Sequence, residues 1–252
     1  MAEYACGDLH GMLHFYKAIK DILKPEDIVY FLGDAGDRGP HPWETIKAIL
    51  DDPQFIYLKG NHELMLCDAL CDYIDTGCPD YHSMSILSMN GGDKTFEEAI
   101  ADPQMEKYYH KLLRLKTLAE YTNPSGERII LSHAGFTPWK EDFYSDDEEK
   151  KDTVYRKPSD RDLVWDREHF LDDWNAEDCV DCYIVHGHTP IPYILDTIDP
   201  LCKLGEIEPG ALWYDNGRKC CIDCGAVFTG ICVLLNLDTW DEEVFYSESY
   251  VS

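Results

Sequence analysis

The fold is decided by one stretch, IVYFLGDAGDRG, which runs from Ile28 to Gly39. Its first five residues are continuously apolar, which is typical of a strand buried on both faces of a sheet. The remainder is a turn of glycine, aspartate and arginine, in which glycine permits tight backbone conformations. Polar clusters follow apolar runs at four other places in the chain, so this stretch indicates how the whole chain is organised.

Strand-like and helix-like segments alternate around this stretch. A short strand is predicted at residues 4–6, and apolar residues recur at helical spacing from Met12 to Leu23. Downstream, residues 42–50 have the pattern of a helix and residues 55–58 that of a strand. This β-α-β-α-β order predicts an α/β layer fold in which helices cover both faces of the sheet.

The middle of the chain has a mostly helical pattern from Glu63 to about Arg128. The clearest helices are predicted over residues 94–100 and 104–120, and Asn90-Gly91-Gly92 interrupts the pattern. We interpret residues of about 64–127 as a helical insertion within a single domain that spans residues 1–252.

The remaining segments are predicted to be strands and loops. The highly charged residues 141–152 are interpreted as a solvated loop. Asn216-Gly217 is a turn signal. Strands are predicted at residues 128–131, 183–185, 220–223, 231–237 and 244–246.

The composition excludes several classes of partner. The 252 residues include 22 Lys and Arg against 49 Asp and Glu, which gives a net charge of −27 and disfavours nucleic acid and anionic membranes.

No apolar run approaches the roughly 18 residues of a membrane span. The N-terminus lacks the basic and apolar regions of a signal peptide. We therefore expect a cytoplasmic protein.

The eleven cysteines are interpreted as reduced thiols, because their number is odd and they are scattered. Cys179/Cys182 and Cys221/Cys224 have CxxC spacing, and two such pairs can bind zinc. However, 38 residues separate the pairs, more than the usual spacing of about 15–20. Ordinary thiols are therefore the favoured interpretation, and a zinc knuckle is the alternative.

Five polar clusters follow five predicted strands. They are Gly7-Asp8-Leu9-His10-Gly11, Gly33-Asp34-Ala35-Gly36-Asp37-Arg38-Gly39, Gly60-Asn61-His62-Glu63, Ser132-His133-Ala134-Gly135 and His186-Gly187-His188-Thr189. The carboxyl ends of parallel strands share one edge of an open α/β sheet, where ligands bind. We therefore expect the five clusters to converge on one site.

The donor atoms in these clusters predict a metal site. Carboxylate, imidazole and amide groups suit Mn, Fe or Zn better than Ca. Asp8 and His10 lie two residues apart on an extended segment, so both can face one ion. The two oxygens of Asp34 could bridge two ions.

A second ion would take Asn61, His133 and one histidine of the pair His186 and His188. Two ions about 3.5–4 Å apart would share a bridging hydroxide and hold a phosphate for in-line attack. The planar fork of Arg38 matches a phosphate group.

Together, the clusters carry a family resemblance. Gly-Asp-x-His-Gly, Gly-Asp-x-x-Asp-Arg-Gly, Gly-Asn-His-Glu, Ser-His-Ala-Gly and Gly-His-Thr resemble the motif series of the phosphoprotein phosphatase (PPP) family. The resemblance is greatest to the bacterial and bacteriophage-type Ser/Thr phosphatases, with which the segments 90–92, 164–168 and 222–228 also agree. It extends from residue 7 to about residue 237 and implies the calcineurin-like metallophosphoesterase fold, a layered β-sandwich flanked by helices.

The resemblance also implies a role for each site residue. The first metal would be bound by Asp8, His10 and Asp34, and the second by Asp34, Asn61, His133 and His188. His62 would be the general acid that protonates the leaving alkoxide, and Asp37 would orient it. Arg38 and Arg167 would hold the phosphate. His188 rather than His186 matches the family, and Gly187 removes bulk just before it.

The implied activity is that of a metal-dependent phosphomonoesterase, a protein Ser/Thr phosphatase whose partner is a phosphoprotein or phosphopeptide. Its cofactors would be two metal ions, Mn with Fe or Zn as alternatives. A hydrolase of symmetrical dinucleoside tetraphosphates shares the motifs and is the alternative enzyme. A catalytically dead metal-binding scaffold would require a lost ligand or arginine, and none is missing. Gly36 and Cys224 depart from the family pattern, but neither is an expected ligand.

Overall fold

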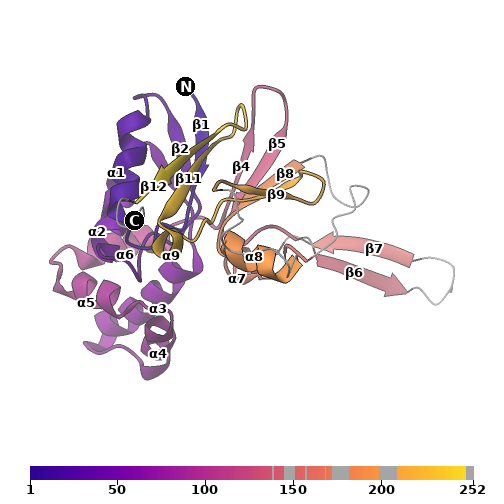
Figure 1. Cartoon of the computed structure of the whole chain (residues 1–252). Helices are drawn as coiled ribbons and strands as arrows, with labels where there is room; N and C mark the ends of the chain where they lie inside the picture. The colour runs from indigo at the N-terminus through magenta and orange to yellow at the C-terminus, as the bar shows by residue number, and fades with distance from the viewer. Residues whose placement is uncertain are drawn as a thin grey trace.

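The computed structural model describes residues 1–137, 139–144, 151–156, 158–167, 169–171, 182–198 and 209–247. Two five-stranded sheets form its centre, and helices flank them (Figure 1). The layered sandwich that the family resemblance implied is therefore confirmed.

The first sheet contains the predicted N-terminal strands. Its order is β12 (Glu242–Tyr246), β11 (Ile231–Asn236), β1 (Glu3–Cys6), β2 (Ile28–Phe31) and β3 (Phe55–Tyr57). β1, β2 and β3 are parallel, with Cys6 opposite Phe31 and Phe31 opposite Tyr57, so these three strands end at one edge. β11 and β12 run antiparallel beside them.

The second sheet has the order β4 (Leu118–Thr122), β5 (Arg128–Ser132), β8 (Cys182–His186), β10 (Lys219–Cys221) and β9 (Leu212–Tyr214). β5, β8 and β10 are parallel to one another. The predicted turn at Asn216-Gly217 joins β9 to β10 and is confirmed, with positive φ angles at both residues.

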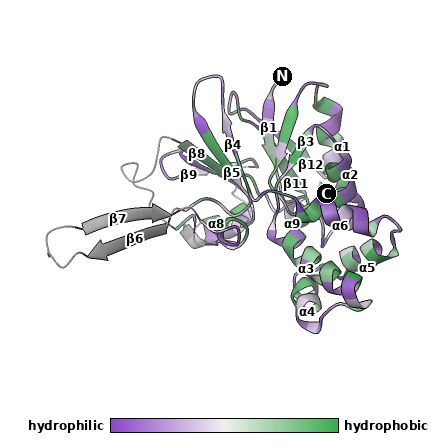
Figure 2. Cartoon of the chain, turned by 180° about the vertical axis from the view of Figure 1, so that it is seen from behind, coloured by the Kyte–Doolittle hydropathy of each residue, from purple (hydrophilic) through white to green (hydrophobic). Residues whose placement is uncertain are grey.

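Alternation along the strands separates two cores. Ala5, Tyr30 and Leu32 pack against Leu131 and Val185 of the second sheet, which fills the space between the sheets. The neighbouring residues Cys6, Val29 and Phe31 point to the opposite face and pack against helices. Figure 2 shows hydrophobic residues concentrated in strands such as β3 and β8.

Two helices connect the parallel strands of the first sheet, as predicted. α1 (Leu13–Ile22) buries Phe15 and Ile19, which lie one turn apart. α2 (Pro42–Asp51) begins with a proline, whose fixed φ suits the first turn, and buries Ile46 and Ile49.

The helical segment between β3 and β4 is shorter than the helical pattern predicted from Glu63 to about Arg128. It contains α3 (Asn61–Thr76), α4 (Tyr81–Met89), α5 (Asp93–Ala101) and α6 (Met105–Leu113). The prediction of helix over residues 104–120 is wrong beyond Leu113, because β4 pairs along its whole length with β5. This pairing partner follows in the chain and overrides the local helical pattern.

The prediction of a solvated loop over residues 141–152 is wrong at both of its ends. β6 (Trp139–Tyr144) pairs antiparallel with β7 (Lys151–Arg156), and the two strands project from the rest of the fold (Figure 1). Three short helices complete the described chain, α7 (Asp162–Trp165), α8 (Ile191–Ile198) and α9 (Ala226–Thr229). Among the described helices, none combines the length and the hydropathy needed to cross a membrane.

Candidate active site

The five polar clusters converge, but from two facing sheets rather than from one sheet edge. Three clusters follow β1, β2 and β3 of the first sheet, and two follow β5 and β8 of the second. Backbone hydrogen bonds tie neighbouring clusters together, from the N–H of His10 to the carbonyl of Asp34 (2.9 Å) and from Gly187 to the carbonyl of His133 (2.8 Å). The argument from one sheet edge therefore covers only part of the site, whereas the expectation of convergence is confirmed.

The backbone at these clusters is unusually strained. Nine non-glycine residues in the described chain have positive φ angles, and six of them belong to the clusters: Asp8, His10, Asp34, Asp37, Arg38 and His188. Positive φ is uncommon for residues with a side chain, and such strain gathers at functional sites. The fold therefore holds these side chains in directions that an ordinary turn would not provide.

Two glycines make room for the carboxylates. A Cβ atom on Gly60 would collide with Oδ1 of Asp34, and one on Gly187 would collide with Oδ2 of Asp8. The structure therefore explains both glycines by the close approach of backbone to an acidic side chain.

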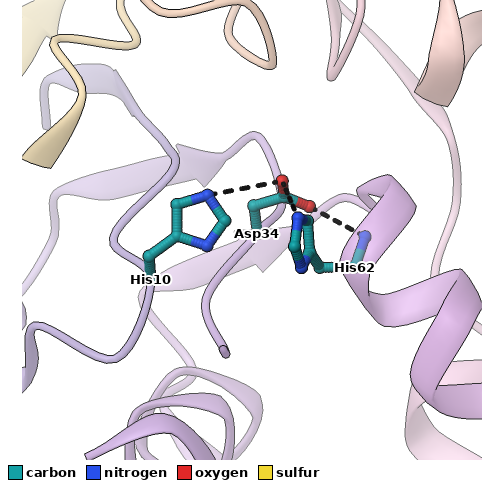
Figure 3. A group of neighbouring side chains, drawn as sticks. All are labelled: His10, Asp34 and His62. Atoms are coloured by element: carbon teal, nitrogen blue, oxygen red, sulfur yellow. Dashed lines mark hydrogen bonds and ion pairs between the residues drawn. The ribbon is translucent and has the colours of Figure 1, made fainter. Parts of the chain in front are cut away.

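One candidate metal group contains His10, Asp34 and His62 (Figure 3). Nε2 of each histidine lies 3.7 Å from Oδ2 of Asp34. Nδ1 of His10 donates to the carbonyl oxygen of Gly36 (3.0 Å), so Nε2 has its lone pair directed toward the group. His62, the predicted general acid, belongs to this candidate group, whereas Asp8, which the resemblance assigns to the first metal, does not.

The guanidinium of Arg38 lies against the same histidines. Its Nη1 donates to Nε2 of His10 (2.7 Å), and its Nη2 donates to Nε2 of His62 (2.9 Å). The positive charge of Arg38 therefore faces Nε2 of both histidines in this group.

The second candidate metal group contains Asp34, His133 and His188. Nε2 of His133 lies 3.4 Å from Oδ2 of Asp34, while Nδ1 donates to the carbonyl oxygen of Leu32 (2.8 Å). Nδ1 of His188 and Nε2 of His133 lie 3.1 Å apart, each 3.0 Å from Oδ1 of Asn61. Asp34 is common to both groups, as expected for a bridging ligand.

Asp8 lies beside the second group. Its Oδ1 accepts a hydrogen bond from the backbone N–H of His188 (3.0 Å), and its Oδ2 is buried with no partner among the described residues. Nε2 of His188 is likewise buried without a partner. Burial raises the pKa of Asp8 well above its usual value, and the nearby Asp223 and Asp34 add to this effect.

The electrostatics single out Asp34 as the permanent anion. Burial alone would raise its pKa, but His133, His62 and His10 together hold that pKa well below the usual value. In contrast, burial and then the neighbouring His62 hold the pKa of His10 well below its usual value. One carboxylate surrounded by several imidazoles is an arrangement that metal cations stabilise.

The residues present fit a metal centre. The donors are oxygen and nitrogen atoms of the kind that Mn, Fe and Zn take, and His10 and His133 are oriented by backbone carbonyls as metal-binding histidines commonly are. Among the described residues, Oδ2 of Asp8 and Nε2 of His188 are buried without a hydrogen-bond partner, while Oδ1 of Asn61, Nε2 of His133 and Nδ1 of His188 crowd together at 3.0–3.1 Å. A bound cation would satisfy these groups.

His62 is held by a carboxylate on its other side. Nδ1 of His62 lies 2.5 Å from Oδ2 of Asp37. Thr95 of α5 binds Asp37 twice, since its hydroxyl donates to Oδ1 and accepts from the backbone N–H (3.1 Å). The sequence did not identify Thr95, because its partner lies 58 positions away.

Glu63 is a second residue whose role the sequence did not reveal, although it lies in a quoted motif. Its buried carboxylate accepts from the backbone N–H groups of Asp34 (2.8 Å), Ala35 (3.0 Å) and Gly60 (2.8 Å), and from the hydroxyl of Tyr57 (2.7 Å). It therefore fixes the two turns that present Asp34 and Asn61. Asp223 is also buried near Asp8, and burial raises its pKa to about 6.

The two groups open into a hollow of about 430 Å³. It is lined by Asp34, Asn61, His62 and His188, and by both predicted phosphate-binding residues, Arg38 and the exposed Arg167. Met89 and Phe228, which are 84% and 64% exposed, form apolar parts of its rim. The hollow can thus hold an anion beside the candidate ligands, with apolar surface nearby for the group that carries it.

The remaining predicted features lie outside this hollow. His186 is buried away from both metal groups, with Nε2 2.6 Å from the hydroxyl of Tyr214. Cys182 packs with Ile130, and Cys221 lies in the core between the sheets. Cys179 lies outside the described residues, so the choice between ordinary thiols and a zinc knuckle stays a prediction.

The fold and the two candidate metal groups that share Asp34 are those of a metal-dependent phosphoesterase. Comparison with known families agrees, since the model of the calcineurin-like phosphoesterases matches residues 4–219. The chain belongs to this family and is accordingly a metal-dependent hydrolase.

Several relatives are dinucleotide hydrolases. The chain is 30% identical over 142 residues to the symmetrical bis(5′-nucleosyl)-tetraphosphatase of Pseudomonas putida, which covers 55% of this chain and 43% of the relative. It is 27% identical over 222 residues to the asymmetrical bis(5′-nucleosyl)-tetraphosphatase of Geobacillus sp. (strain WCH70), covering 79% and 85%. The matched region is thus less than half of the length of the first relative.

The fold is also that of a protein phosphatase. A protein serine/threonine phosphatase from Saccharomyces cerevisiae has a TM-score of 0.54 and 13% identity, covering 98% of this chain and 80% of that one. This likeness shows a shared fold.

Proposed function

We propose that the chain is a metal-dependent phosphomonoesterase that removes phosphate from phosphoserine and phosphothreonine in proteins. One observation carries the proposal: two candidate metal groups share Asp34 and open into a hollow that also presents two arginines and the His62–Asp37 pair. These are the parts that hydrolysis of a phosphate ester of a poor leaving group requires.

The residues that would hold two metal ions are Asp8, His10, Asp34, Asn61, His133 and His188. When bound, such ions supply an activated hydroxide and neutralise the charge of the phosphate. Asp34 bears its charge between the two groups, and Glu63 keeps it in place through the backbone of the turn.

Arg38 and Arg167 would bind the phosphate. Arg38 now donates to His10 and His62, and phosphate oxygens are stronger acceptors for the same N–H groups. Transfer of these hydrogen bonds to the substrate would leave Nε2 of His62 facing the ester. Met89 and Phe228 at the rim would contact the alcohol side of that ester.

His62 would then protonate the leaving oxygen. Asp37 lies against Nδ1, so it fixes the ring orientation and stabilises the charged imidazole that carries the proton on Nε2. A serine or threonine alkoxide is a poor leaving group, and proton transfer to it lowers the barrier.

Hydrolysis of dinucleoside tetraphosphates is the second candidate function. Relatives of this chain carry that name, both in the symmetrical and in the asymmetrical form. The metal groups and arginines would serve it equally, because the reaction also transfers a phosphoryl group to water.

The two functions differ in their substrates and products. The purified chain, supplied with Mn²⁺, is assayed with a panel of phosphoserine, phosphothreonine and phosphotyrosine peptides and with diadenosine tetraphosphate. We expect release of inorganic phosphate from the phosphopeptides with a higher kcat/KM than nucleotide release from the dinucleotide. The opposite order would replace the proposal by the second function.

A further inference from the structure

A second hollow of about 630 Å³ lies on the flank of the candidate active site. The two hollows have no lining residue in common, but two stretches of the chain contribute neighbouring residues to each of them. Lys59 and Leu64 enclose Asn61 and His62 in sequence, and the segment 160–164 leads directly to Arg167. The N–H of Lys59 also donates to the carbonyl of Lys116, which brings the chain after α6 into the wall.

Three cations line this second hollow, namely Lys59, Lys116 and Arg161. The only acidic residue in its lining is Asp160, whose Oδ1 accepts from the hydroxyl of Thr117 (2.8 Å). Within the described part of the chain, no carboxylate lies within ion-pair distance of any of the three cations. On a chain with 49 acidic and 22 basic residues, a lining with three cations and one carboxylate is a local reversal of sign.

The rest of the lining is apolar. It consists of Leu64, Leu113, Leu115, Leu118 and Val164. Leu113 ends α6 and is 45% exposed, so apolar surface as well as charge faces the hollow.

We propose that the second hollow binds a segment of the substrate protein in which acidic residues flank a large apolar side chain. Carboxylates of this segment would pair with Lys59, Lys116 and Arg161, and its apolar side chain would lie against the leucines. The charge is complementary to an acidic partner and repels a basic one. Because the stretches 59–64 and 160–167 contribute to both hollows, such a segment would lie near the phosphorylated residue and would raise the local concentration of substrate at the arginines.

This inference rests on the proposed function, since it assigns the sequence around the phosphorylated residue. The net charge of −27 by itself would favour substrates in which basic residues flank the phosphorylated residue. The second hollow predicts acidic flanks instead. Short-range contacts in a hollow are less screened by salt than the field of the whole molecule.

Binding is tested first without chemistry. A fluorescein-labelled peptide, Glu-Asp-Leu-Glu-Leu, carries no phosphate and is titrated against the full chain by fluorescence anisotropy. We expect Lys116→Glu/Arg161→Glu to weaken its binding about tenfold, because two attractive pairs become repulsive. Lys17→Glu/Lys24→Glu on the exposed surface at α1 makes the same change in net charge and should leave binding unchanged.

Catalysis is tested with a phosphoserine peptide, with and without this extension. The extension should raise kcat/KM in the wild type and in the α1 variant, but not in Lys116→Glu/Arg161→Glu, and turnover of p-nitrophenyl phosphate should be equal in all three. Equal peptide binding by both double variants, or an equal gain from a basic extension, would overturn the inference. Inorganic phosphate and unlabelled peptide are also compared as competitors of the labelled peptide. If phosphate displaces the labelled peptide as effectively as the unlabelled peptide does, the hollow is a general anion site and the inference is overturned.

Failure of the proposed function gives a different pattern. The wild type would then release no phosphate from either phosphopeptide, while the anisotropy measurement would still report on the second hollow.

Discussion

His62 contacts three charged residues of the site. Its Nε2 faces Asp34 and Arg38, and its Nδ1 faces Asp37. The sequence predicts a general acid, whereas the structure brings the residue into a candidate metal group with His10. A substitution that preserves shape can separate these roles.

We expect His62→Asn to keep its metal content near that of the wild type and to lower kcat by about 10²–10⁴, the usual range for loss of a general acid. The loss should be smaller on aryl phosphates, whose leaving groups need less protonation. Metal analysis and steady-state kinetics of the purified variant provide the measurement. A variant that lacks one metal ion would instead place His62 among the ligands.

His186 and His188 are two residues apart and occupy different environments. Nδ1 of His188 faces Asn61 and His133, whereas His186 contacts Tyr214 and the carbonyl of Gly187. The difference follows from the positive φ of His188, which turns its side chain toward the centre.

His188→Ala is therefore expected to lose the second metal ion and nearly all activity. His186→Ala should keep both ions and lose far less activity, since the contacts that disappear, with Tyr214 and the carbonyl of Gly187, involve neither candidate metal group. Metal content of the two variants, measured side by side, decides the assignment. Loss of metal from the His186 variant alone would show that the wrong histidine was chosen.

At the scale of elements, α5 matters because it carries Thr95 to Asp37 and thereby supports His62. Asp102, directly after α5, fastens this helix to α2. Its Oδ2 accepts from Nζ of Lys47 (2.6 Å) and from Nε1 of Trp43 (2.9 Å). The hydrogen bond from Lys47, assisted by the backbone N–H of Gln104, lowers the pKa of Asp102 to about 2.

Asp102→Asn should lower the free energy of unfolding by about 1.5 kcal/mol at pH 7, the lower end of the range for hydrogen bonds to a charged group. Because the folded-state pKa lies below the unfolded value, the carboxylate stabilises the fold above about pH 4, and this contribution is lost as pH falls toward 2. The difference between wild type and variant should therefore shrink from pH 7 to pH 3. Urea unfolding at several pH values measures it.

The control is Asp21→Asn, on the exposed surface of α1. It makes the same change in charge and should alter stability little at any pH. A constant deficit of Asp102→Asn at all pH values would mean that packing, and not the charged pair, stabilises the junction of α2 and α5.

At the scale of the whole molecule, the two sheets must stay in register for the metal groups to exist. His10, Asp34 and His62 come from one sheet, and His133 and His188 from the other. Metal ions held by both would therefore also link the sheets, and their removal should be visible in activity and in stability.

We expect a chelator to abolish turnover of p-nitrophenyl phosphate and to lower the thermal unfolding midpoint, because the buried acceptors lose their positive partner. Mn²⁺ should restore both better than Mg²⁺ or Ca²⁺, given the imidazole-rich donor set. Metal analysis accompanies each assay. Full turnover by a preparation shown to be free of metal would rule out the binuclear centre.

The local sequence pattern determined many of the strands, helices and turns of this molecule. The apolar run 28–32, the helical spacing in α1 and the turn at Asn216-Gly217 each depend on neighbouring residues, and all three are confirmed. The polar clusters after the strands were equally visible, because motif spacing and glycine reflect how closely the backbone approaches a ligand. Their roles as metal ligands, general acid and phosphate clamps stay predictions.

Only the tertiary structure decided the features that depend on distant partners. β4 is a strand because β5 pairs with it, although its own pattern predicts helix. Glu63 and Thr95 became site residues because folding places the turn at Asp34 and the carboxylate of Asp37 against them. The convergence from two facing sheets, and the cationic hollow beside the site, likewise arise from segments far apart in the chain, whose meeting is set by packing between layers rather than by local propensity.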